Sequence, residues 1–290
     1  MEAVRLRGPG LDALELAEVD LPRLEAGQAL VRVHAAALTR GELEWPLDRL
    51  PAIPSYELAG VVEAVAPDVA EVAPGAAVIG LTPFDRDGVA AQYAAVDAAV
   101  LAEKPRALTH VESAALPLPG LSAWQGLFVH GRLRPGERVL VHGATGGVGQ
   151  LAAHLAQLHG ADVIGTTSRT SRTVDGGCEL VDLAAGRFEE AVAPVDLVFD
   201  TVGGDVLARS HAVLRDGGRL VSVAEEAAGA TYFVVQPDRE QLAELVRLAD
   251  EGALRPEIDS VFALRDARAA FERSESRAKR GKVVLRVVDE

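Results

Sequence analysis

Hydrophobic residues follow one pattern up to about His110 and a different one after it. In the first part, short apolar or alternating stretches are separated by Pro and Gly. Alternation with a period of two, bounded by such residues, predicts β-strands. The stretches are Leu14–Leu16, Leu30–Leu38, Gly60–Val65, Ala76–Gly80 and Gly88–Val96. This part of the chain therefore predicts a β-rich domain of irregular barrel type.

From Val111 onward, apolar strands alternate with helical patterns. Val111–Arg132 predicts one long helix, and six short apolar segments after it predict strands. The predicted strands are Arg138–Val141, Asp162–Thr166, Glu179–Val181, Asp196–Asp200, Arg219–Val223 and Tyr232–Val235. Strands that alternate with helices are typical of a doubly wound parallel sheet, so this part predicts an α/β fold.

Two of the later segments have apolar residues at the spacing of one helix face. These residues are Val148, Leu151, Ala152 and Leu155 in one segment, and Leu242, Leu245, Val246 and Ala249 in the other. We expect both helices to pack this face on the parallel sheet. A last helix over Arg265–Glu275 and a strand over Val283–Val288 follow Pro256.

The composition is that of a folded protein of about two domains. The 290 residues are 49% hydrophobic and 25% charged, which are ordinary values for globular proteins. The net charge of −14 repels phosphate backbones and anionic lipid, which argues against nucleic acid and membranes as partners. The first ten residues contain no cationic segment followed by an apolar core, and no apolar run approaches about 18 residues. We therefore expect a cytoplasmic protein.

Several kinds of chemistry are excluded or lack support. Cys178 is the only cysteine, which excludes internal disulfides and zinc sites built from several thiolates. The seven histidines form no recognisable catalytic set, so a structural role is the default for each. The chain also lacks the G-x-S-x-G, H-E-x-x-H and Lys-containing phosphate-loop motifs, so hydrolase, metalloprotease and NTPase functions have no support.

A glycine-rich loop joins a predicted strand to a predicted helix. The strand over Arg138–His142 is followed by Gly143-Ala144-Thr145-Gly146-Gly147-Val148-Gly149 and then by the first amphipathic helix. Glycines at such a junction allow a tight turn and a close approach of backbone N–H groups to a pyrophosphate, and the helix N-terminus favours its negative charge. In this context the loop predicts dinucleotide binding.

The second predicted strand indicates which dinucleotide is bound. An NAD site usually has Asp or Glu at the end of this strand, whereas this strand ends in Thr167, Ser168 and Arg169, with Arg172 nearby. A hydroxyl and a guanidinium suit a 2′-phosphate, which favours NADPH over NADH. The alternative is that these are solvated loop residues.

The chain resembles the zinc-free medium-chain dehydrogenase/reductases, specifically the branch of quinone oxidoreductases (zeta-crystallin-like) and enoyl reductases. Several motifs carry this resemblance, and they occur in the same order as in the family. They are Val31–Ala37, Pro54–Val62, Ala114–Pro117, Leu121–Trp124, Val139–Gly149, Phe199–Gly204, Gly217–Val221 and Gly281–Leu285. The resemblance implies a GroES-like β-barrel domain of residues 1–112 and 254–290 and a Rossmann domain of residues 113–253. It also implies that Thr39 and Tyr56 stand where zinc-dependent relatives have a Cys and a His, so that no metal is expected.

The resemblance further implies a set of cofactor contacts. The pyrophosphate is lined by Gly146, Gly147, Val148 and Gly149, and the 2′-phosphate is faced by Ser168, Arg169 and Arg172. The nicotinamide carboxamide is met by Ser122, and beside the nicotinamide run Phe233, Val234 and Val235. The cofactor is also contacted by Val202 and Arg277. Alternatives stay open for three of these. Ser122 can be a locally satisfied helix hydroxyl, Phe233–Val235 only an apolar strand, and Arg277 only a solvated cation.

The sequence departs from the family pattern in three places. The segments Ser168–Cys178 and Ala224–Ala230 are shorter than expected, and the loop at Thr39 and Glu42 lacks the Asn or Asp that relatives commonly have there. Cofactor and substrate contacts that the family has in these segments therefore do not transfer directly to this sequence.

The candidates for chemistry lie in the first domain. Tyr56 and Thr39 are candidate proton donors, and Trp45 and Phe84 are candidate walls for a planar substrate. The alternative for Tyr56 is an aromatic residue that lines the cleft while backbone groups satisfy its hydroxyl. Hydride transfer needs a cofactor and a substrate held in contact with water excluded, and the cofactor supplies the chemistry.

The sequence thus predicts a zinc-independent, NADPH-dependent oxidoreductase that acts on a quinone or an activated C=C bond of an enone. Two alternatives stay open: a tailoring enoyl reductase of a biosynthetic pathway, and a non-catalytic NADPH-binding sensor or structural protein. We also expect a homodimer through the strand over residues 231–235, because an apolar outermost strand otherwise exposes its backbone edge.

Overall fold

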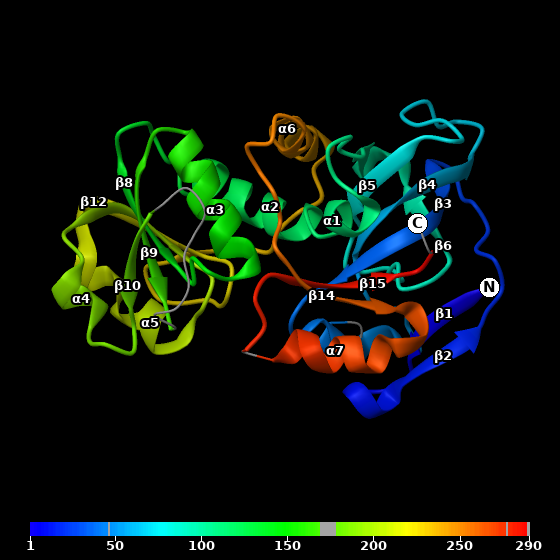
Figure 1. Ribbon diagram of the computed structural model, residues 1–290, viewed down its shortest axis with the longest axis horizontal. Coiled ribbons are helices and arrows are strands. Elements are labelled where there is room, and N and C mark those ends of the chain that lie inside the picture. The colour runs from blue at the N-terminus through cyan, green and yellow to red at the C-terminus, as the bar shows by residue number, and fades with distance from the viewer. Residues whose placement is uncertain (46, 169–177, 277, 289–290) are drawn as a thin grey trace. The chain divides into compact units, whose positions relative to one another are not determined.

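The computed structural model describes residues 1–45, 47–168, 178–276 and 278–288, which form two compact units (Figure 1). Unit 1 comprises Met1–Leu118 and Gln236–Glu290, and unit 2 comprises Pro119–Val235. The sequence places the boundaries at 112/113 and 253/254 instead. The boundary near residue 254 moves to residue 236 because helix α6 (Arg239–Asp250) packs against strand β7 (Leu101–Glu103) of unit 1.

The strands of unit 1 form a barrel-like sheet, antiparallel except for the parallel pair β14 (Ile258–Ala263) and β15 (Lys282–Arg286), and a separate strand pair. The other strands are β1 (Glu2–Leu6), β2 (Leu14–Glu18), β3 (Gln28–Leu38), β4 (Glu57–Val65), β5 (Ala77–Leu81), β6 (Tyr93–Asp97) and β7. The main sheet has the order β14-β15-β3-β4-β5-β7, with β6 also paired to β3, and β1 pairs with β2. The long strand β3 is antiparallel to both β4 and β15. The end of β3 therefore lies beside the beginnings of β4 and β15.

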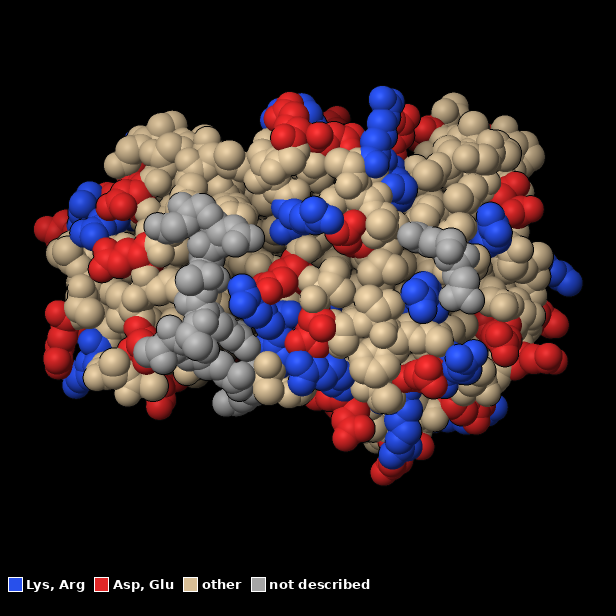
Figure 2. Space-filling model, viewed as in Figure 1, with Lys and Arg blue, Asp and Glu red and all other residues tan. Residues whose placement is uncertain are grey.

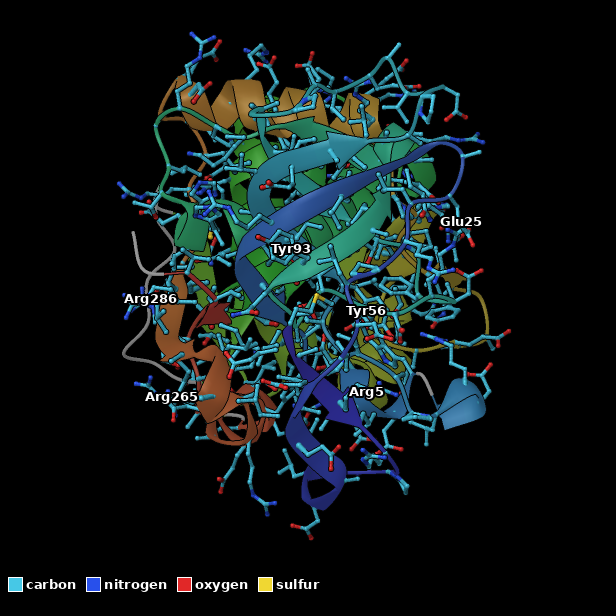
Figure 3. All side chains as sticks on the ribbon, turned by 90° about the vertical axis from the view of Figure 1, so that its right-hand side faces the viewer. Arg5, Glu25, Tyr56, Tyr93, Arg265 and Arg286 are labelled. Carbon is cyan, nitrogen blue, oxygen red and sulfur yellow. The ribbon has the colours of Figure 1, made fainter. Side chains whose placement is uncertain are left out.

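The core of unit 1 is built from alternating apolar residues of these strands. Val31, Val33, Leu58 and Val283 are fully buried in it, and so is Phe271 of helix α7 (Ala267–Glu275). The period-two pattern puts every second side chain on this core and leaves the alternate positions for other contacts. Figure 3 shows unit 1 with its side chains and labels Tyr56, directly before β4, and Tyr93 on β6.

Unit 2 is a doubly wound parallel sheet, which confirms the predicted α/β class. Its strands are β8 (Arg138–His142), β9 (Asp162–Thr167), β10 (Glu179–Asp182), β11 (Val195–Asp200), β12 (Leu214–Ser222) and β13 (Thr231–Tyr232). Their order is β10-β9-β8-β11-β12-β13, and all are paired in parallel. Helices α3 (Gly147–Leu158), α4 (Phe188–Ala191) and α5 (Gly204–Arg209) belong to this unit. In a sheet of this order, ligands bind at the carboxyl ends of the central strands.

Two helix predictions are wrong in detail. The predicted helix over Val111–Arg132 is divided into α1 (His110–Ala114), α2 (Pro117–Trp124) and a π-helical segment (Gln125–His130). The break precedes Pro117 because proline has no N–H to continue a helix, although it fits the first position of a new one. The apolar face of α6 packs against β7 and not on the parallel sheet. Its period-3.6 pattern predicts a buried face but does not identify the partner.

The remaining helical turns are short 3-10 segments. They are Leu11–Ala13, Glu42–Glu44, Leu47–Arg49, Ala98–Val100, Ser210–Val213 and Leu264–Asp266. Acidic and basic side chains are intermingled on the face shown in Figure 2. No described helix is long and apolar enough to span a bilayer.

Candidate functional site

The glycine-rich segment of residues 143–149, here called the nucleotide loop, ends in backbone donors that have no intrahelical partner. Gly143 follows β8 with a positive φ of 73°, and Gly146 N donates to Gly143 O at 2.8 Å to close a tight turn. Gly146 caps α3 without a side-chain bond, and Gln150 N makes the first intrahelical bond, to Gly146 O. The N–H groups of residues 147–149 precede that bond. They form the N-terminal donor set that favours a phosphate anion.

Gly149 lets the helix approach the loop closely. A Cβ atom at this position would lie 2.1 Å from Gly143 O and 2.7 Å from Gly143 C, both of them backbone atoms. Only hydrogen fits there, so the first turn of α3 packs directly on the loop. This is the physical reason for the third glycine that the sequence pattern predicts.

A second loop of unit 2 lies beside Gly143 and is held by a buried carboxylate. Asp200, at the end of β11, accepts hydrogen bonds from Val202 N at 3.2 Å, Gly203 N at 3.1 Å and Ser222 Oγ at 2.8 Å. The side chain of Val202 is 49% exposed, and a Cβ on Gly143 would come within 2.9 Å of its Cγ2 atom. Sequence reasoning gave Asp200 no role, although its place at the end of a central strand is a usable signal.

Ser122 has the burial expected of a hydroxyl that is kept for a ligand. The residue is 1% exposed, and its Oγ atom has no hydrogen-bond partner among the described residues. A buried hydroxyl without a partner costs free energy, which a carboxamide would recover by bonding to it. This arrangement fits the predicted nicotinamide contact better than the alternative of a locally satisfied helix hydroxyl.

The segment after β13 presents one exposed side chain between two buried ones. Phe233 and Val235 are buried, whereas Val234 is 49% exposed. His130 stacks on Phe233 with ring centroids 4.5 Å apart. The regular strand ends at Tyr232, so Phe233, Val234 and Val235 lie beyond it and not within it.

Of the residues predicted to face the 2′-phosphate, the structure describes Ser168. Ser168 directly follows β9 and is exposed. Strand β9 is the neighbour of β8, the strand that leads into the nucleotide loop. Arg169, Arg172 and Arg277 lie outside the described residues. Within the described part of unit 2, the free N–H groups, the close contact at Gly149 and the unpartnered Ser122 hydroxyl all fit a nicotinamide dinucleotide.

In unit 1, Thr39, Glu57 and Lys282 form a buried group that we call the ion cluster. Lys282 Nζ pairs with Glu57 Oε1 and donates to Thr39 Oγ1 at 2.8 Å. Thr39 Oγ1 is 3.2 Å from Glu57 Oε1, and Leu118 N donates to Glu57 Oε2 at 2.9 Å. Burial raises the pKa of Glu57, and Lys282 and the other donors oppose that rise. Sequence reasoning missed Glu57 and Lys282, because they come from strands far apart in the chain.

Glu42 lies next to the ion cluster. It is buried, its Oε2 atom accepts a hydrogen bond from Thr39 N at 3.0 Å, and its Oε1 atom has no partner among the described residues. Burial raises the pKa of Glu42 to about 8, although Lys282 and the Thr39 N–H act to lower it. At neutral pH this carboxyl is therefore mostly protonated and uncharged.

Trp45, Tyr56 and Phe84 come together as an aromatic cluster. Their ring centroids are 5.0 to 5.7 Å apart. Tyr56 is fully buried, and its hydroxyl accepts a hydrogen bond from Arg49 Nη2 at 2.8 Å. Burial raises the pKa of the Tyr56 phenol to about 12. The structure thus brings both predicted substrate walls to Tyr56, whose hydroxyl is satisfied by a guanidinium and not by the backbone.

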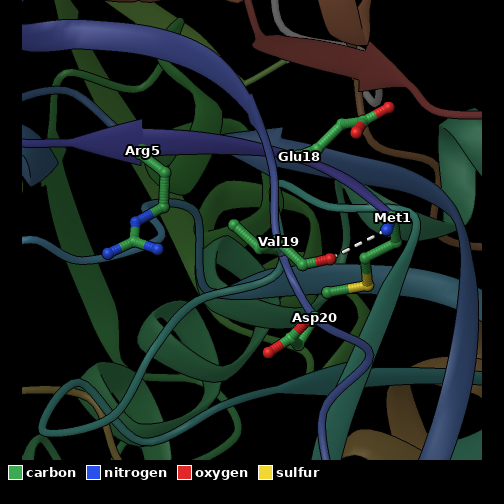
Figure 4. Close-up of a pocket in the computed structure, with 5 residues that line it drawn as sticks. All are labelled: Met1, Arg5, Glu18, Val19 and Asp20. Atoms are coloured by element: carbon green, nitrogen blue, oxygen red, sulfur yellow. Dashed lines mark hydrogen bonds between the residues drawn. The ribbon is translucent and has the colours of Figure 1, made fainter.

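An open polar hollow in unit 1 has none of these features. Met1, Arg5, Glu18, Val19 and Asp20 line it, and the terminal ammonium of Met1 donates to Val19 O at 2.8 Å (Figure 4). None of the predicted site residues borders it. In the described part of the chain, no group of three or more His, Cys, Asp or Glu side chains is arranged to hold a metal ion.

Two family models match the chain. The one described as the alcohol dehydrogenase GroES-like domain matches residues 25–106, and the one described as zinc-binding dehydrogenase matches residues 176–285. They fall on the two parts of the chain that differ in hydrophobic pattern.

Individual relatives match over nearly the whole chain. A probable mitochondrial zinc-binding oxidoreductase of Arthroderma benhamiae is 33% identical over 92% of this chain and 90% of its own length. A chloroplastic NADPH-dependent alkenal/one oxidoreductase of Arabidopsis thaliana is 29% identical over 95% of this chain and 76% of its own length. The solved quinone oxidoreductase of Coxiella burnetii is 31% identical, with a TM-score of 0.93 over 99% of both chains.

Proposed function

The chain belongs to the medium-chain dehydrogenase/reductase family, which consists of nicotinamide-dependent oxidoreductases, and on that premise we propose that it transfers a hydride from NADPH to a quinone or an activated C=C bond without zinc. One observation carries the proposal. Thr39 and Tyr56 stand at the two positions where zinc-dependent relatives have a Cys and a His, so these positions offer no thiolate or imidazole to a zinc ion. In the structure Thr39 belongs to the ion cluster and Tyr56 to the aromatic cluster.

The class of substrate follows from this chemistry. Hydride addition to an isolated ketone produces a localised alkoxide, which a zinc ion or a committed acid must stabilise. Addition to an enone or quinone instead produces an anion whose charge is delocalised over several atoms. Backbone N–H groups and one hydroxyl are sufficient for such an anion, and these are the groups that the chain offers. The alkenal/one reductase and quinone oxidoreductase relatives support the same class.

Residues of unit 2 would hold the cofactor. The N–H groups of residues 147–149 would bind the pyrophosphate, Ser122 would bond to the carboxamide, and Asp200 would hold Val202 beside the loop. Bound in this way, the cofactor supplies the hydride. Trp45, which is 37% exposed, and Phe84 would form walls for a planar substrate in unit 1.

The preference for NADPH rests on Ser168 and Arg169. A charge-assisted hydrogen bond contributes about 1.5 to 3 kcal/mol. We expect Arg169→Ala to weaken NADPH binding roughly tenfold or more and NADH binding very little. Fluorescence titration of the same variant with both cofactors provides the internal control. Equal losses for NADPH and NADH would contradict the assignment.

We further propose a cytoplasmic homodimer that pairs β13, the outermost strand of unit 2. Tyr232 is exposed on this strand, and an apolar strand at the edge of a sheet favours association with a second copy of the chain. Light scattering at micromolar protein concentration tests the assembly, and a monomeric mass would refute it.

The experiment that tests the function follows NADPH oxidation with a panel of quinones, enones, an enoyl thioester and matched saturated ketones, with and without a chelator. We expect turnover of quinones or enones that survives chelation. A tailoring enoyl reductase would favour an acyl thioester in this panel, and a protein that only binds the cofactor would show saturable affinity without turnover. Turnover that depends on a metal would contradict the zinc-free assignment.

A further inference from the structure

The topology of unit 1 brings the three residues of the ion cluster together. Thr39 follows the end of β3, Glu57 begins β4 and Lys282 begins β15. In the sheet, Ala37 pairs with Glu57, and Leu38 pairs with Val283. Because β3 lies between the other two strands and runs antiparallel to both, Thr39 is placed where it can contact Glu57 and Lys282 together.

The members of the ion cluster differ in their access to solvent. The side chains of Lys282 and Glu57 are only 6% and 1% exposed, whereas Thr39 is partly exposed. Thr39 is therefore the most exposed member of the ion cluster, and its hydroxyl contacts both members of the buried pair.

The hydrogen bonds of Thr39 have the polarity of a proton relay. Lys282 donates to Thr39 Oγ1 at 2.8 Å, and this oxygen can donate its own hydrogen to Glu57 at 3.2 Å. A hydroxyl hydrogen rotates freely about its C–O bond, and a contact of 3.2 Å is long for an O–H donor. Thr39 can therefore turn its hydrogen to another acceptor without losing the bond from Lys282. Donation by a cation makes the hydroxyl a better donor.

We propose that Thr39 delivers the proton that completes reduction of an enone and that Lys282 replaces it. The inference rests on the proposed function and names the proton donor of that reaction. Thr39 is the residue that touches the substrate, and Lys282 is a positioning residue that acts through it. Glu57 holds the ammonium in place.

In the proposed step, the β-carbon of the enone receives a hydride. The π pair of the C=C bond forms a double bond between the α-carbon and the carbonyl carbon, and the π pair of the C=O bond moves to the carbonyl oxygen. The O–H bond of Thr39 breaks as its proton moves to that oxygen, and a proton of Lys282 Nζ moves to Thr39 Oγ1. The neutral amine of Lys282 then regains a proton from water through Thr39. The resulting enol becomes the saturated ketone in water, with one hydride and one proton consumed in total.

Tyr56, the other candidate donor, is less suited to this step. It is fully buried within the aromatic cluster, and its hydroxyl is bonded to Arg49. Arg49 also donates to Phe84 O and to Arg86 O, the latter at 2.9 Å, so this guanidinium is anchored to the backbone. These contacts give Tyr56 a structural role in holding the substrate wall.

The test compares two substrates that differ in their need for a proton. An enone yields a basic enolate that the enzyme must protonate, whereas a nitroalkene yields a stabilised nitronate that is protonated in bulk water. We expect Thr39→Val to lower kcat for the enone by about 100-fold, the usual loss for a general acid, and to lower kcat for the nitroalkene by a much smaller factor. Thr39→Ser, which keeps the hydroxyl, should retain enone turnover.

Lys282→Met should show the same loss, much larger for the enone than for the nitroalkene, which a merely structural role would not produce. If that variant fails to fold, the Thr39 pair decides the matter alone. Equal losses of kcat for both substrates in Thr39→Val, or no loss for either, would overturn the proton relay. Turnover of the enone by the wild-type protein would in that case still support the proposed function. Failure of the wild-type protein to reduce the enone, the nitroalkene and a quinone would instead refute the proposed function.

Discussion

The nucleotide loop of unit 2 and the ion cluster of unit 1 are built in opposite ways. The loop uses the backbone of consecutive residues, and its glycines keep side chains out of the way. The cluster uses charged and polar side chains from the ends of three strands, and Lys282 lies 243 positions after Thr39. The loop therefore depends on local conformation, whereas the cluster depends on the folded barrel and on a balance of buried charge.

This difference predicts how each region fails. A backbone site is damaged by added volume, because the packing of α3 on the loop leaves no space at Gly149. A buried ion pair is damaged by loss of one partner, because the remaining charge has no water to solvate it. The predictions below separate these two kinds of damage.

The largest effect is expected when the ion cluster loses its cation. Lys282→Met leaves Glu57 buried without its charged partner and should lower the free energy of unfolding by about 3 to 5 kcal/mol. Urea unfolding followed by circular dichroism measures this. In the control, the double variant Glu57→Gln with Lys282→Met removes both charges and should recover much of the loss. A single variant as stable as the wild type would show that the pair is not buried as a charge pair.

Added volume in the nucleotide loop should have a smaller effect on stability but a marked effect on binding. Gly149→Ala forces a Cβ against Gly143 O and should cost about 1 to 3 kcal/mol of stability. NADPH affinity should fall at least about tenfold, because the donors of residues 147–149 move with the helix. Gly186→Ala, also in unit 2, is the control, since nothing lies within 4 Å of its added Cβ. Unchanged affinity in Gly149→Ala would mean that the loop does not contact the cofactor.

Glu42 provides a smaller effect that depends on pH. Its pKa of about 8 in the folded protein lies above the ordinary value of 4.5, so the folded state keeps a proton that the unfolded state loses. This stabilising contribution is complete below pH 4.5 and is lost as pH rises through 8. Lys282, Glu57 and Glu275 all act on this carboxyl.

Glu42→Gln removes this titration and keeps an oxygen to accept from Thr39 N. The stability of the variant relative to the wild type should therefore increase by about 1.4 kcal/mol for each pH unit between roughly pH 5 and 7.5. Urea unfolding at several pH values gives this difference directly, because other groups titrate alike in both proteins. A difference independent of pH would mean that Glu42 is ionised in the folded protein.

The two regions also differ in how far the sequence predicts them. The strand, glycines and helix of the nucleotide loop are contiguous, so their spacing alone indicates both the fold of unit 2 and its ligand. Asp200 required the structure, because its hydrogen bonds leave no pattern in the sequence. Ser122 is predicted from the resemblance, and the structure adds that its buried hydroxyl has no hydrogen-bond partner among the described residues.

In unit 1 the sequence indicates strands but not the contacts among their ends. The resemblance singles out Thr39 and Tyr56, and Trp45 and Phe84 are candidate walls for a planar substrate. The structure brings the last three together. Lys282 and Glu57 carry no local signal, since only the register of β15, β3 and β4 makes them neighbours. The assignment of α6 failed for the same reason, because an amphipathic pattern does not specify which sheet it covers.

The most direct test of the whole account supplies NADPH deuterated at C4 with an enone and, separately, with the corresponding saturated ketone. The account predicts deuterium at the β-carbon of the reduced enone and no reaction of the saturated ketone, as mass spectrometry and NMR of the products would show. Efficient conversion of the saturated ketone to a deuterated alcohol would contradict it.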